Sequence, residues 1–449
     1  MKLPLSEKLN DLADACPFPL YVVGGYVRDC IAGKLRENGD VDICAPVSAE
    51  EFCAVAEKAG AVVTAVYRGT GTVKLRLGEE EYEFACFRSD EYVRGIHTPV
   101  KTFFTYDINL DARRRDFKCN AVYYEIKSRT VCDPLGGTED IINRRITTVA
   151  DADKVFGEDG LRLMRLARQS AQLGFEPSED CIEGAKNNVP LLKDVSAERI
   201  YAELQSILHA DGAYGLQGAQ YRGLKLLDKI GALDIIIPEL TLGRGMKQNE
   251  RFHNYDVLEH SLRTVLYSDE SIRLAALLHD VGKPYCMINN GSYRMHEAES
   301  ARIAKEICER LKVSKKLTAE TVELSALHMY DLRCDARENK IRKFIVRNNA
   351  VLEKLLYIKQ ADYSACKDDS SKAPCVEKWL GIYEKMRSEG APLNLRQLKV
   401  NGAELISAGV RTEDVGKVLL RLLDDCAIEP RLNEKKALIK RALGVCCER

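Results

Sequence analysis

Residues 21–42 read YVVGGYVRDCIAGKLRENGDVD, and this stretch decides the fold of the N-terminal part of the chain. Its first three residues predict a short buried strand, which Gly24 and Gly25 end before a helix begins. Two adjacent glycines let phosphate oxygens approach the backbone, and the helix N-terminus adds N–H donors. The guanidinium of Arg28, a few residues further on, adds a positive charge and further N–H donors. The stretch therefore indicates a phosphate-binding turn, although a purely structural turn would use the same glycines.

Two carboxylates, Asp40 and Asp42, close this stretch after a turn-like segment at residues 37–39. In a strand, side chains two positions apart lie on one face, roughly 6.5 Å apart. Such a pair can hold one or two divalent ions, and magnesium fits because it prefers carboxylates together with substrate phosphates. A DxD pair alone is a weak signal. Next to the glycine turn, it predicts metal-dependent chemistry on a triphosphate.

Length and composition limit the number of domains and the class of protein to be expected. The 449 residues exceed what one ordinary core organises, so two or more domains are expected, and 45% hydrophobic with 30% charged residues is typical of a soluble globular protein. No stretch approaches the roughly 20 apolar residues that a bilayer-spanning helix needs. The 16 cysteines are scattered without a CxxC pair, which favours buried thiols over disulfides. We therefore expect a cytoplasmic protein without membrane contact.

The hydrophobic pattern changes along the chain. Between about residues 20 and 126, short runs such as TVKLRL, YEFACF and NAVYYEI predict a sheet with a few helices. After residue 138, long amphipathic segments such as GLRLMRLARQSAQL, RLAALLHDV and VGKVLLRLLDDC predict a largely helical remainder. The formal net charge is -1, so any site for a polyanion must be local, where arginines cluster.

The glycine turn and the DxD pair together resemble the polymerase-beta-like nucleotidyltransferases, specifically the class II tRNA nucleotidyltransferases and bacterial poly(A) polymerases. The resemblance implies that Asp40 and Asp42 carry catalytic Mg²⁺ and that the triphosphate contacts Gly24, Gly25 and Arg28.

A third catalytic carboxylate is usual on a neighbouring strand in this family. Glu83 is the candidate, and Glu81, which shares its strand face, is the competitor.

The segment ARRRDFKCNA resembles a second motif of the same family. A run of exposed arginines is usually a solvated face, but the resemblance implies contact with the nucleotide. The matching positions are Arg114, Arg115, Asp116 and Asn120, and Lys118 stands where the family has threonine. The motif therefore adds two arginines and an aspartate to the predicted nucleotide site.

A third segment, FGEDGLR, carries Asp159 and Arg162, which are neighbours on one face if a helix begins here. Cytosine and adenine share an amine donor beside a ring-nitrogen acceptor, so a carboxylate and a guanidinium could read both and reject uracil and guanine. An ordinary helix salt bridge is the structural alternative. The segment resembles the base-selecting motif of the family, with Gly160 in place of proline. Arg165 and Arg168 continue the spacing toward triphosphate or RNA.

Four of the 7 histidines fall in an ordered series that ends with an aspartate. This series resembles an HD domain, a helical module that can hold a metal and hydrolyse phosphoesters, and neutral imidazole with carboxylate suits several divalent transition metals. A structural role without metal is the alternative. The series consists of His260, His279 with Asp280, His296, His328 and Asp362, and the resemblance implies the ligands His260, His279, Asp280 and Asp362.

The expected fold is α+β, with a polymerase-beta-like nucleotidyltransferase head (1–137), a helical neck and body (138–243), an HD domain (244–370) and a helical tail (371–449) that binds tRNA. The expected activity is addition of C, C and A to tRNA from CTP and ATP. The alternatives are a poly(A) polymerase, a CC-only or A-only enzyme, and an HD phosphohydrolase with an RNA-binding head. The loop at residues 89–105, which governs such switching in the family, departs here from the usual pattern.

Overall fold

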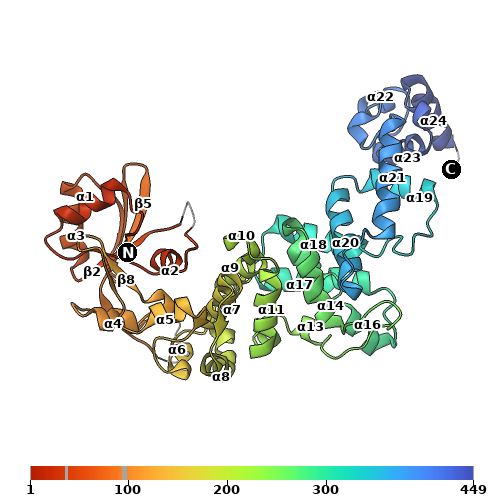
Figure 1. Cartoon of the computed structure of the whole chain (residues 1–449). Helices are drawn as coiled ribbons and strands as arrows, with labels where there is room; N and C mark the ends of the chain where they lie inside the picture. Colours follow the sequence, from red (N-terminus) through yellow and green to blue (C-terminus); the bar gives the residue numbers. More distant parts are fainter. Residues whose placement is uncertain (1, 36–38, 94–98, 448–449) are drawn as a thin grey trace. The chain divides into compact units, whose positions relative to one another are not determined.

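The computed structural model describes residues 2–35, 39–93 and 99–447, and the chain divides into two compact units, Met1–Pro238 and Glu239–Arg449. In Figure 1 the first unit runs from red to yellow-green and the second from green to blue. The finer division into four domains stays a prediction. None of the helices in the described part of the chain combines the length and apolar character that a bilayer-spanning segment needs.

A seven-stranded mixed sheet forms the centre of the first unit, with the strand order β3-β4-β5-β2-β1-β8-β9. β2 runs parallel to β5, whereas the other neighbouring pairs are antiparallel. The expected mixed sheet is confirmed. Its strands are β1 (Tyr21–Val23), β2 (Asp42–Ala45), β3 (Val62–Tyr67), β4 (Thr72–Leu77), β5 (Glu80–Cys86), β8 (Tyr123–Glu125) and β9 (Thr130–Cys132).

The two faces of β5 differ in burial. Phe84 is fully buried and stacks on Phe52 of α3 (Ala49–Lys58), with ring centroids 3.6 Å apart, whereas Glu81 and Glu83 are exposed. Because alternate side chains of a strand point to opposite faces, the helix covers one face and the carboxylates lie on the other.

Short helices and hairpins surround this sheet (Figure 1). Described parts of the loop at residues 89–105 form a two-stranded sheet, and residues 94–98 lie outside the described residues. Gly137 begins α5 against the backbone of η1, where an added Cβ would lie 2.0 Å from the Lys118 carbonyl oxygen, so only glycine fits. These elements are α1 (Glu7–Ala15), α2 (Gly25–Ile31), β6 (Arg88–Glu91), β7 (Lys101–Phe104), α4 (Ile108–Arg113), η1 (Lys118–Asn120) and α5 (Gly137–Ile142).

The rest of the first unit is helical apart from one short parallel strand pair, β10 with β11. The amphipathic segment predicted near residue 161 is α7, whose apolar side is buried. The elements are β10 (Arg145–Ile146), α6 (Ala152–Glu158), α7 (Leu161–Leu173), β11 (Glu176–Pro177), α8 (Glu179–Asn188), α9 (Ala197–Leu208), α10 (Ala210–Tyr214), α11 (Ala219–Ile230) and α12 (Leu233–Ile236). The next helix, α13 (Pro238–Thr241), begins at the last residue of this unit.

The described part of the second unit is all helical. The predicted amphipathic segments RLAALLHDV and VGKVLLRLLDDC form α15 and α23. The helices are α14 (Val257–Tyr267), α15 (Arg273–Leu278), α16 (Lys283–Asn290), α17 (His296–Arg310), α18 (Lys315–Leu327), α19 (Glu338–Arg347), α20 (Leu352–Lys367), α21 (Pro374–Ser388), α22 (Gly402–Ser407), α23 (Val415–Ile428) and α24 (Lys435–Cys447).

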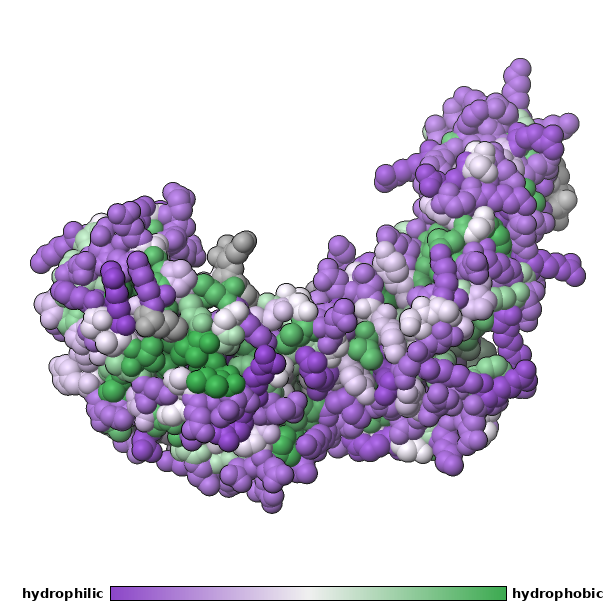
Figure 2. Space-filling view, viewed as in Figure 1, coloured by the Kyte–Doolittle hydropathy of each residue, from purple (hydrophilic) through white to green (hydrophobic). Residues whose placement is uncertain are grey.

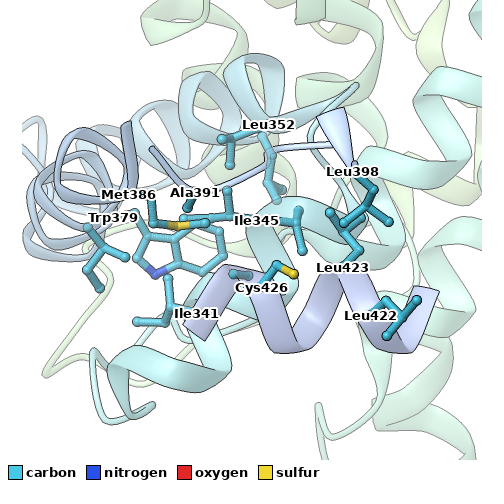
Figure 3. Packing of buried hydrophobic residues seen from close by; sticks show 14 of the residues in the cluster. Ile341, Ile345, Leu352, Trp379, Met386, Ala391, Leu398, Leu422, Leu423 and Cys426 are labelled. Carbon is cyan, nitrogen blue, oxygen red and sulfur yellow. The ribbon is translucent and has the colours of Figure 1, made fainter. Parts of the chain in front are cut away.

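One hydrophobic core joins the helices of the second unit from α18 to α24 and also includes Ala275 of α15 (Figure 3). Trp379 is fully buried in it, and its indole N–H donates to Asp331 at 3.0 Å. Ile341 and Ile345 of α19 and Met386 of α21 pack in the same core. Burial of these large apolar side chains stabilises this unit.

The surface shown in Figure 2 is largely hydrophilic, and the largest hydrophobic area in that view lies on the first unit.

Candidate functional site

A cleft of about 630 Å³ lies in the first unit, next to the C-terminal end of β1. It brings together the predicted nucleotide-site residues of the head and of the neck and body, apart from Glu83, although Gly24 and Arg168 lie 144 positions apart in the sequence. The lining includes Gly24, Gly25, Arg28, Asp40, Asp42, Arg114, Arg115, Asp116, Asp159, Arg162, Arg165 and Arg168.

The glycine turn joins β1 to α2. Gly24 has φ +82°, a conformation that side chains with a Cβ rarely adopt, and an added Cβ would lie 3.7 Å from Asp42 Oδ2. Gly25 then starts α2 and presents the N-terminus of that helix to the cleft. The positive φ therefore favours glycine at position 24, and the N-terminus of α2 faces the cleft, as a phosphate-binding turn requires.

The two aspartates line the same cleft, but only one lies in a strand. Asp42 is the first residue of β2, whereas Asp40 precedes the strand, so the expectation of a shared strand was wrong for Asp40. Residues 37 and 38 of the predicted turn lie outside the described residues. Surrounding protein raises the pKa of Asp42 to about 6, and repulsion from Glu83 and Asp40 adds to the effect although Arg115 opposes it. A cation held by these oxygens would relieve that repulsion.

The sheet register distinguishes the two candidates for a third carboxylate. Glu83 is the direct cross-strand partner of Asp42, whereas Glu81 lies opposite Arg76 of β4. The Glu83 carboxylate also lies 3.9 Å from the Lys74 ammonium. The register therefore favours Glu83 over Glu81.

Buried Asp111 holds the arginine motif in place. Its carboxylate accepts from Arg114 Nε at 2.7 Å, from Arg115 Nη2 at 3.1 Å and from the Tyr123 hydroxyl at 2.7 Å. Burial alone would raise the pKa of Asp111, but Arg115 and Arg114 outweigh burial and lower it to about 2. An ionised aspartate thus orients two arginines at the cleft wall, and the sequence had not singled it out.

Arg28 is buried and already engaged by protein groups. Its guanidinium donates to Asp29 at 2.7 and 2.9 Å, to Asn120 Oδ1 at 2.7 Å and to the Tyr214 hydroxyl at 3.0 Å. Tyr214 donates in turn to Asp29 at 2.7 Å. Tyr214 comes from α10, far along the chain, and no sequence pattern indicated it.

Asp116 joins the arginine motif to α7. Its carboxylate accepts from Arg165 Nε and Nη2 at 2.8 and 2.6 Å and from Asn120 at 3.2 Å. Burial would raise the pKa of Asp116, but Arg165 and these hydrogen bonds lower it to about 2. Asp116 therefore positions Arg165 at the cleft, where the sequence predicted that both would contact the nucleotide.

The two residues of the predicted base reader have separate partners. Arg162 donates to the Val155 carbonyl at 2.9 Å, to Glu158 at 2.7 Å and to the Arg114 carbonyl at 3.1 Å. The guanidinium also lies 5.4 Å from the ring centroid of Tyr92.

Asp159 accepts from the Leu161 N–H at 3.0 Å and pairs with Arg199 of α9 at 3.1 Å. Arg199 belongs to the segment SAERIY, which resembles the helical neck of the family, but the sequence did not place it at the cleft. Gly160 lies against η2 (Val189–Asp194), where an added Cβ would be 3.0 Å from the Leu191 carbonyl oxygen. This close packing gives a physical reason for glycine where the family has proline.

A second polar site lies within the second unit. His260 of α14, His279 and Asp280 after α15, and Asp362 of α20 come together there, and the described structure adds His296 and His328. His260 Nε2 lies 3.0 Å from Asp362 Oδ1 and 3.4 Å from Asp280 Oδ2. The groups are spaced so that they could hold a metal ion.

Charge in this histidine cluster is balanced internally. Burial would lower the pKa of His279, but Asp280 and Asp362 outweigh burial and raise it to about 10. Burial lowers the pKa of His328. Without an ion, the His279 imidazolium and the Lys283 ammonium, 2.5 Å from Asp280, are therefore the counter-charges. Metal binding would displace the His279 proton.

Three family descriptions match the chain in succession: the Poly A polymerase head domain over residues 20–147, the probable RNA and SrmB-binding site of polymerase A over 174–242, and the HD domain over 257–364. The A-adding tRNA nucleotidyltransferase of Deinococcus radiodurans is 30% identical over 374 residues, which cover 79% of each chain. The CCA-adding enzyme of Geobacillus kaustophilus is 37% identical over 198 residues, 42% of this chain and 46% of the relative.

A crystal structure of the Bacillus stearothermophilus CCA-adding enzyme in complex with CTP matches over 99% of both chains, with TM-score 0.68 and 22% identity, and so shares the fold. Mixed sheet, glycine turn and aspartate-lined cleft define the protein as a nucleotidyltransferase with a polymerase-beta-like head. The chain belongs to the family of class II tRNA nucleotidyltransferases and poly(A) polymerases that carry an HD domain.

Proposed function

We propose that this protein adds C, C and A to the 3′ end of tRNA, using CTP and ATP and releasing pyrophosphate, in the cytoplasm. One observation carries the proposal: the aspartates Asp40 and Asp42 share a single cleft with Asp159 and Arg162. The first pair has the chemistry for nucleotidyl transfer and the second for selecting a base. The names of the relatives, A-adding and CCA-adding enzymes, agree with tRNA as the substrate.

In this reaction the tRNA 3′-hydroxyl attacks the α-phosphate and pyrophosphate leaves. Asp40 and Asp42, with Glu83 as third carboxylate, would hold Mg²⁺, and their hard oxygen donors and mutual repulsion fit that ion. Mg²⁺ bound there supplies Lewis-acid stabilisation of the attacking and leaving oxygens.

The protein's own groups bind and orient the substrates. Gly24 and Gly25 would offer backbone N–H groups to the triphosphate, and the arginines at the cleft wall would offer charged donors. We assign these contacts to Arg28, Arg114, Arg115, Arg165 and Arg168, with Asp116 as the residue that orients Arg165.

Base selection would use Asp159 and Arg162 as a protein template. The carboxylate accepts from the exocyclic amine of cytosine or adenine, and the guanidinium donates to the adjacent ring nitrogen. Uracil and guanine present the reverse order and would leave buried polar groups unpaired. For Arg162 to read a base, its hydrogen bond to Glu158 must be exchanged for one to the nucleotide.

We also propose that the histidine cluster holds a divalent transition metal through His260, His279, Asp280 and Asp362. Imidazole with carboxylate favours such ions over magnesium. Phosphohydrolase activity there would be additional to nucleotide addition.

The decisive test uses tRNA lacking CCA and tRNA ending in CC, each incubated with labelled CTP, ATP or both. Extension of the first substrate by three nucleotides only when both nucleotides are present supports the proposal. A long A ladder would instead identify a poly(A) polymerase. Addition of C but no A when both nucleotides are present would identify a CC-adding enzyme. Absence of any addition, with phosphate released from phosphoesters, would identify a phosphohydrolase.

A second candidate, addition of the terminal A alone, is favoured by one finding. The A-adding enzyme of Deinococcus radiodurans matches over 79% of its length, whereas the Geobacillus kaustophilus CCA-adding enzyme matches over 46% of its length. An A-only enzyme would extend tRNA ending in CC and leave the shorter tRNA unchanged with CTP. The same assay therefore separates the two candidates.

A further inference from the structure

We propose that Tyr214 is a positioning residue for triphosphate binding, because its hydroxyl holds the Arg28 guanidinium beside the glycine turn of the cleft. The inference rests on the proposed function of this cleft and deepens it. Tyr214 belongs to α10, which lies outside the motifs that predicted the nucleotide site. It would act on the triphosphate through Arg28 and not by touching the reacting atoms.

The Arg28 guanidinium folds back over the turn between β1 and α2. A Cβ added to Gly25 would lie 3.4 Å from Arg28 Nη2 and 4.0 Å from Cζ. Gly24, Gly25 and Arg28 all line the cleft. The charged N–H donors of Arg28 and the backbone N–H groups of the turn therefore face one place, where a triphosphate would meet both.

Asp29, Asn120 and Tyr214 hold this guanidinium from different sides. Nε and Nη2 donate to Asp29 Oδ1 at 2.9 and 2.7 Å, and Nη1 donates to Asn120 Oδ1 at 2.7 Å. Nη2, the atom that lies next to Gly25, also donates to the Tyr214 hydroxyl at 3.0 Å. Tyr214 thus contacts the end of the guanidinium that faces the turn.

The Tyr214 hydroxyl also orients the carboxylate of Asp29. It donates to Asp29 Oδ2 at 2.7 Å, whereas Oδ1 accepts from Arg28. A hydroxyl that accepts from Nη2 and donates to Oδ2 closes a ring of hydrogen bonds among three side chains. Arg28 and Asp29 are buried, so water competes little for this ring. The ring restricts a long, flexible side chain before the nucleotide binds, which lowers the entropy cost of binding.

The helices of the body determine where Tyr214 lies. Tyr214 is the last residue of α10, and Gly215, with φ +66°, ends this helix. α10 packs against α7, the helix that brings Arg165 to the same cleft. Both helices belong to the first unit. The packing of α10 on α7 therefore completes a site whose other members come from the head.

A purely structural tyrosine is the competing explanation. In that role the hydroxyl would only satisfy Asp29 and join α10 to α2. Arg28 already gives Asp29 a charged partner through two hydrogen bonds, so the carboxylate does not depend on Tyr214 for satisfaction. The two roles differ in their consequences: a structural role alters stability, whereas a positioning role alters the affinity for phosphate groups in particular.

The test compares ligands with and without the β- and γ-phosphates. Binding of CTP, ATP, pyrophosphate, CMP and AMP to the full-length chain is measured with Mg²⁺ by isothermal titration calorimetry. Tyr214→Phe removes only the hydroxyl, so Kd for CTP, ATP and pyrophosphate should rise about 10-fold, as expected for a weakened hydrogen bond to a charged group. CMP and AMP should keep their wild-type values.

Tyr67→Phe is the matched control. It makes the same chemical change at a half-exposed residue of β3 outside the lining of the cleft, and every Kd should stay unchanged. Equal weakening of CTP and CMP by Tyr214→Phe would assign the structural role and overturn the inference.

A double-mutant cycle tests whether Tyr214 acts through Arg28. Arg28→Lys keeps the charge but lacks Nη2, so Tyr214→Phe should weaken CTP binding no further in this background. An equal loss in both backgrounds would show that the hydroxyl acts independently of Arg28, which contradicts the inference.

These measurements need no tRNA, so they separate the inference from the proposed function. A wild-type protein that binds neither CTP nor ATP overturns both, whereas wild-type binding unchanged by Tyr214→Phe overturns the inference alone. If circular dichroism shows that Tyr214→Phe misfolds, 3-fluorotyrosine is placed at position 214, which keeps the hydroxyl. Its fluorine resonance should shift with pyrophosphate and not with CMP, and a resonance that responds to neither would contradict the role of Tyr214.

Discussion

The aspartates of the head cleft and those of the histidine cluster face different partners. In the cleft, aspartates pair with the arginines that would meet the substrate: Asp111 with Arg114, and Asp116 with Arg165. In the cluster, Nε2 of His260 and His279 faces Asp280 Oδ2, Nε2 of His296 and His328 faces Oδ1, and Lys283 contacts Oδ2. The first site is an open cleft that orients donors for a large anion, whereas the groups of the second site are buried and close enough together to hold a metal ion. Similar residue types thus serve different ligands because burial differs.

The largest expected effect is at the open site. Asp42→Asn keeps the shape of the side chain but removes a charge that would hold Mg²⁺, so nucleotide addition should fall by at least about 10²–10³-fold, the loss seen when one electrostatic contact to a transition state is removed. Single-turnover addition to tRNA measures it. tRNA binding, followed by filter retention, should stay near normal.

Glu79→Gln, in an exposed turn outside the cleft, is the matched control and should keep full activity. An Asp42→Asn enzyme that retains wild-type rates would show that the cleft is not the catalytic site.

The next effect concerns base selection. Asp159→Asn replaces an acceptor by an amide that can also donate, so discrimination of CTP over UTP should fall by roughly 10- to 100-fold, which corresponds to the roughly 1.5–3 kcal/mol of a hydrogen bond to a charged group. Ratios of kcat/KM for the two nucleotides measure it. Asp159 is preferable to Arg162 for this test because Arg162 also binds two backbone carbonyls. Unchanged ratios would remove the template role.

At the closed site, removal of ions should affect stability first. An ion present at about 100 times its dissociation constant contributes roughly 2.7 kcal/mol, so chelation should lower the thermal midpoint of the second unit by about 5–10 °C. Thermal unfolding with hydrogen exchange in α14 and α17 measures it. Co²⁺ should restore the midpoint, and Asp280→Asn should not respond to either treatment. A wild-type protein indifferent to chelation would contradict metal binding.

The smallest expected effect depends on pH and belongs to the paired charges of the cleft. The folded pKa of Asp116, about 2, lies below the ordinary value of 3.8, so its ionised form stabilises the fold above pH 3.8 and this contribution is lost as the pH falls toward 2. Asp116→Asn should therefore cost on the order of 2 kcal/mol at pH 7.

Thermal unfolding from pH 7 to pH 2.5 should show a difference of about 4–8 °C between wild type and Asp116→Asn that narrows below pH 4. A difference that stays constant with pH would assign the loss to packing instead of charge.

Much of the fold was predictable because it depends on local periodicity. The apolar run at residues 21–23 and the alternation in TVKLRL predicted β1 and β4, and the helical spacing after residue 160 predicted α7. The position of Asp40 outside β2 was not predictable, because strand ends depend on which backbone groups find partners in the sheet.

The candidate site was predictable only where its residues form short motifs. Asp42, Arg115 and Arg162 stand in such motifs, whereas Asp111 and Tyr214 do not. Arg199 lies in a segment that resembles the helical neck of the family, but only the fold brings it to the cleft. The choice of Glu83 over Glu81 likewise needed the register of β2 against β5, because both have the same strand parity.

By itself, the sequence determined the class of chemistry, because a glycine turn followed by paired aspartates is a local arrangement that few other functions require. It also showed that histidines and aspartates form an ordered series in the second half of the chain. Only the tertiary structure decided that His296 and His328 meet Asp280 Oδ1, on the side away from Lys283. That difference depends on the packing of α17 against Gly282. Distances between residues far apart in sequence are set by packing alone.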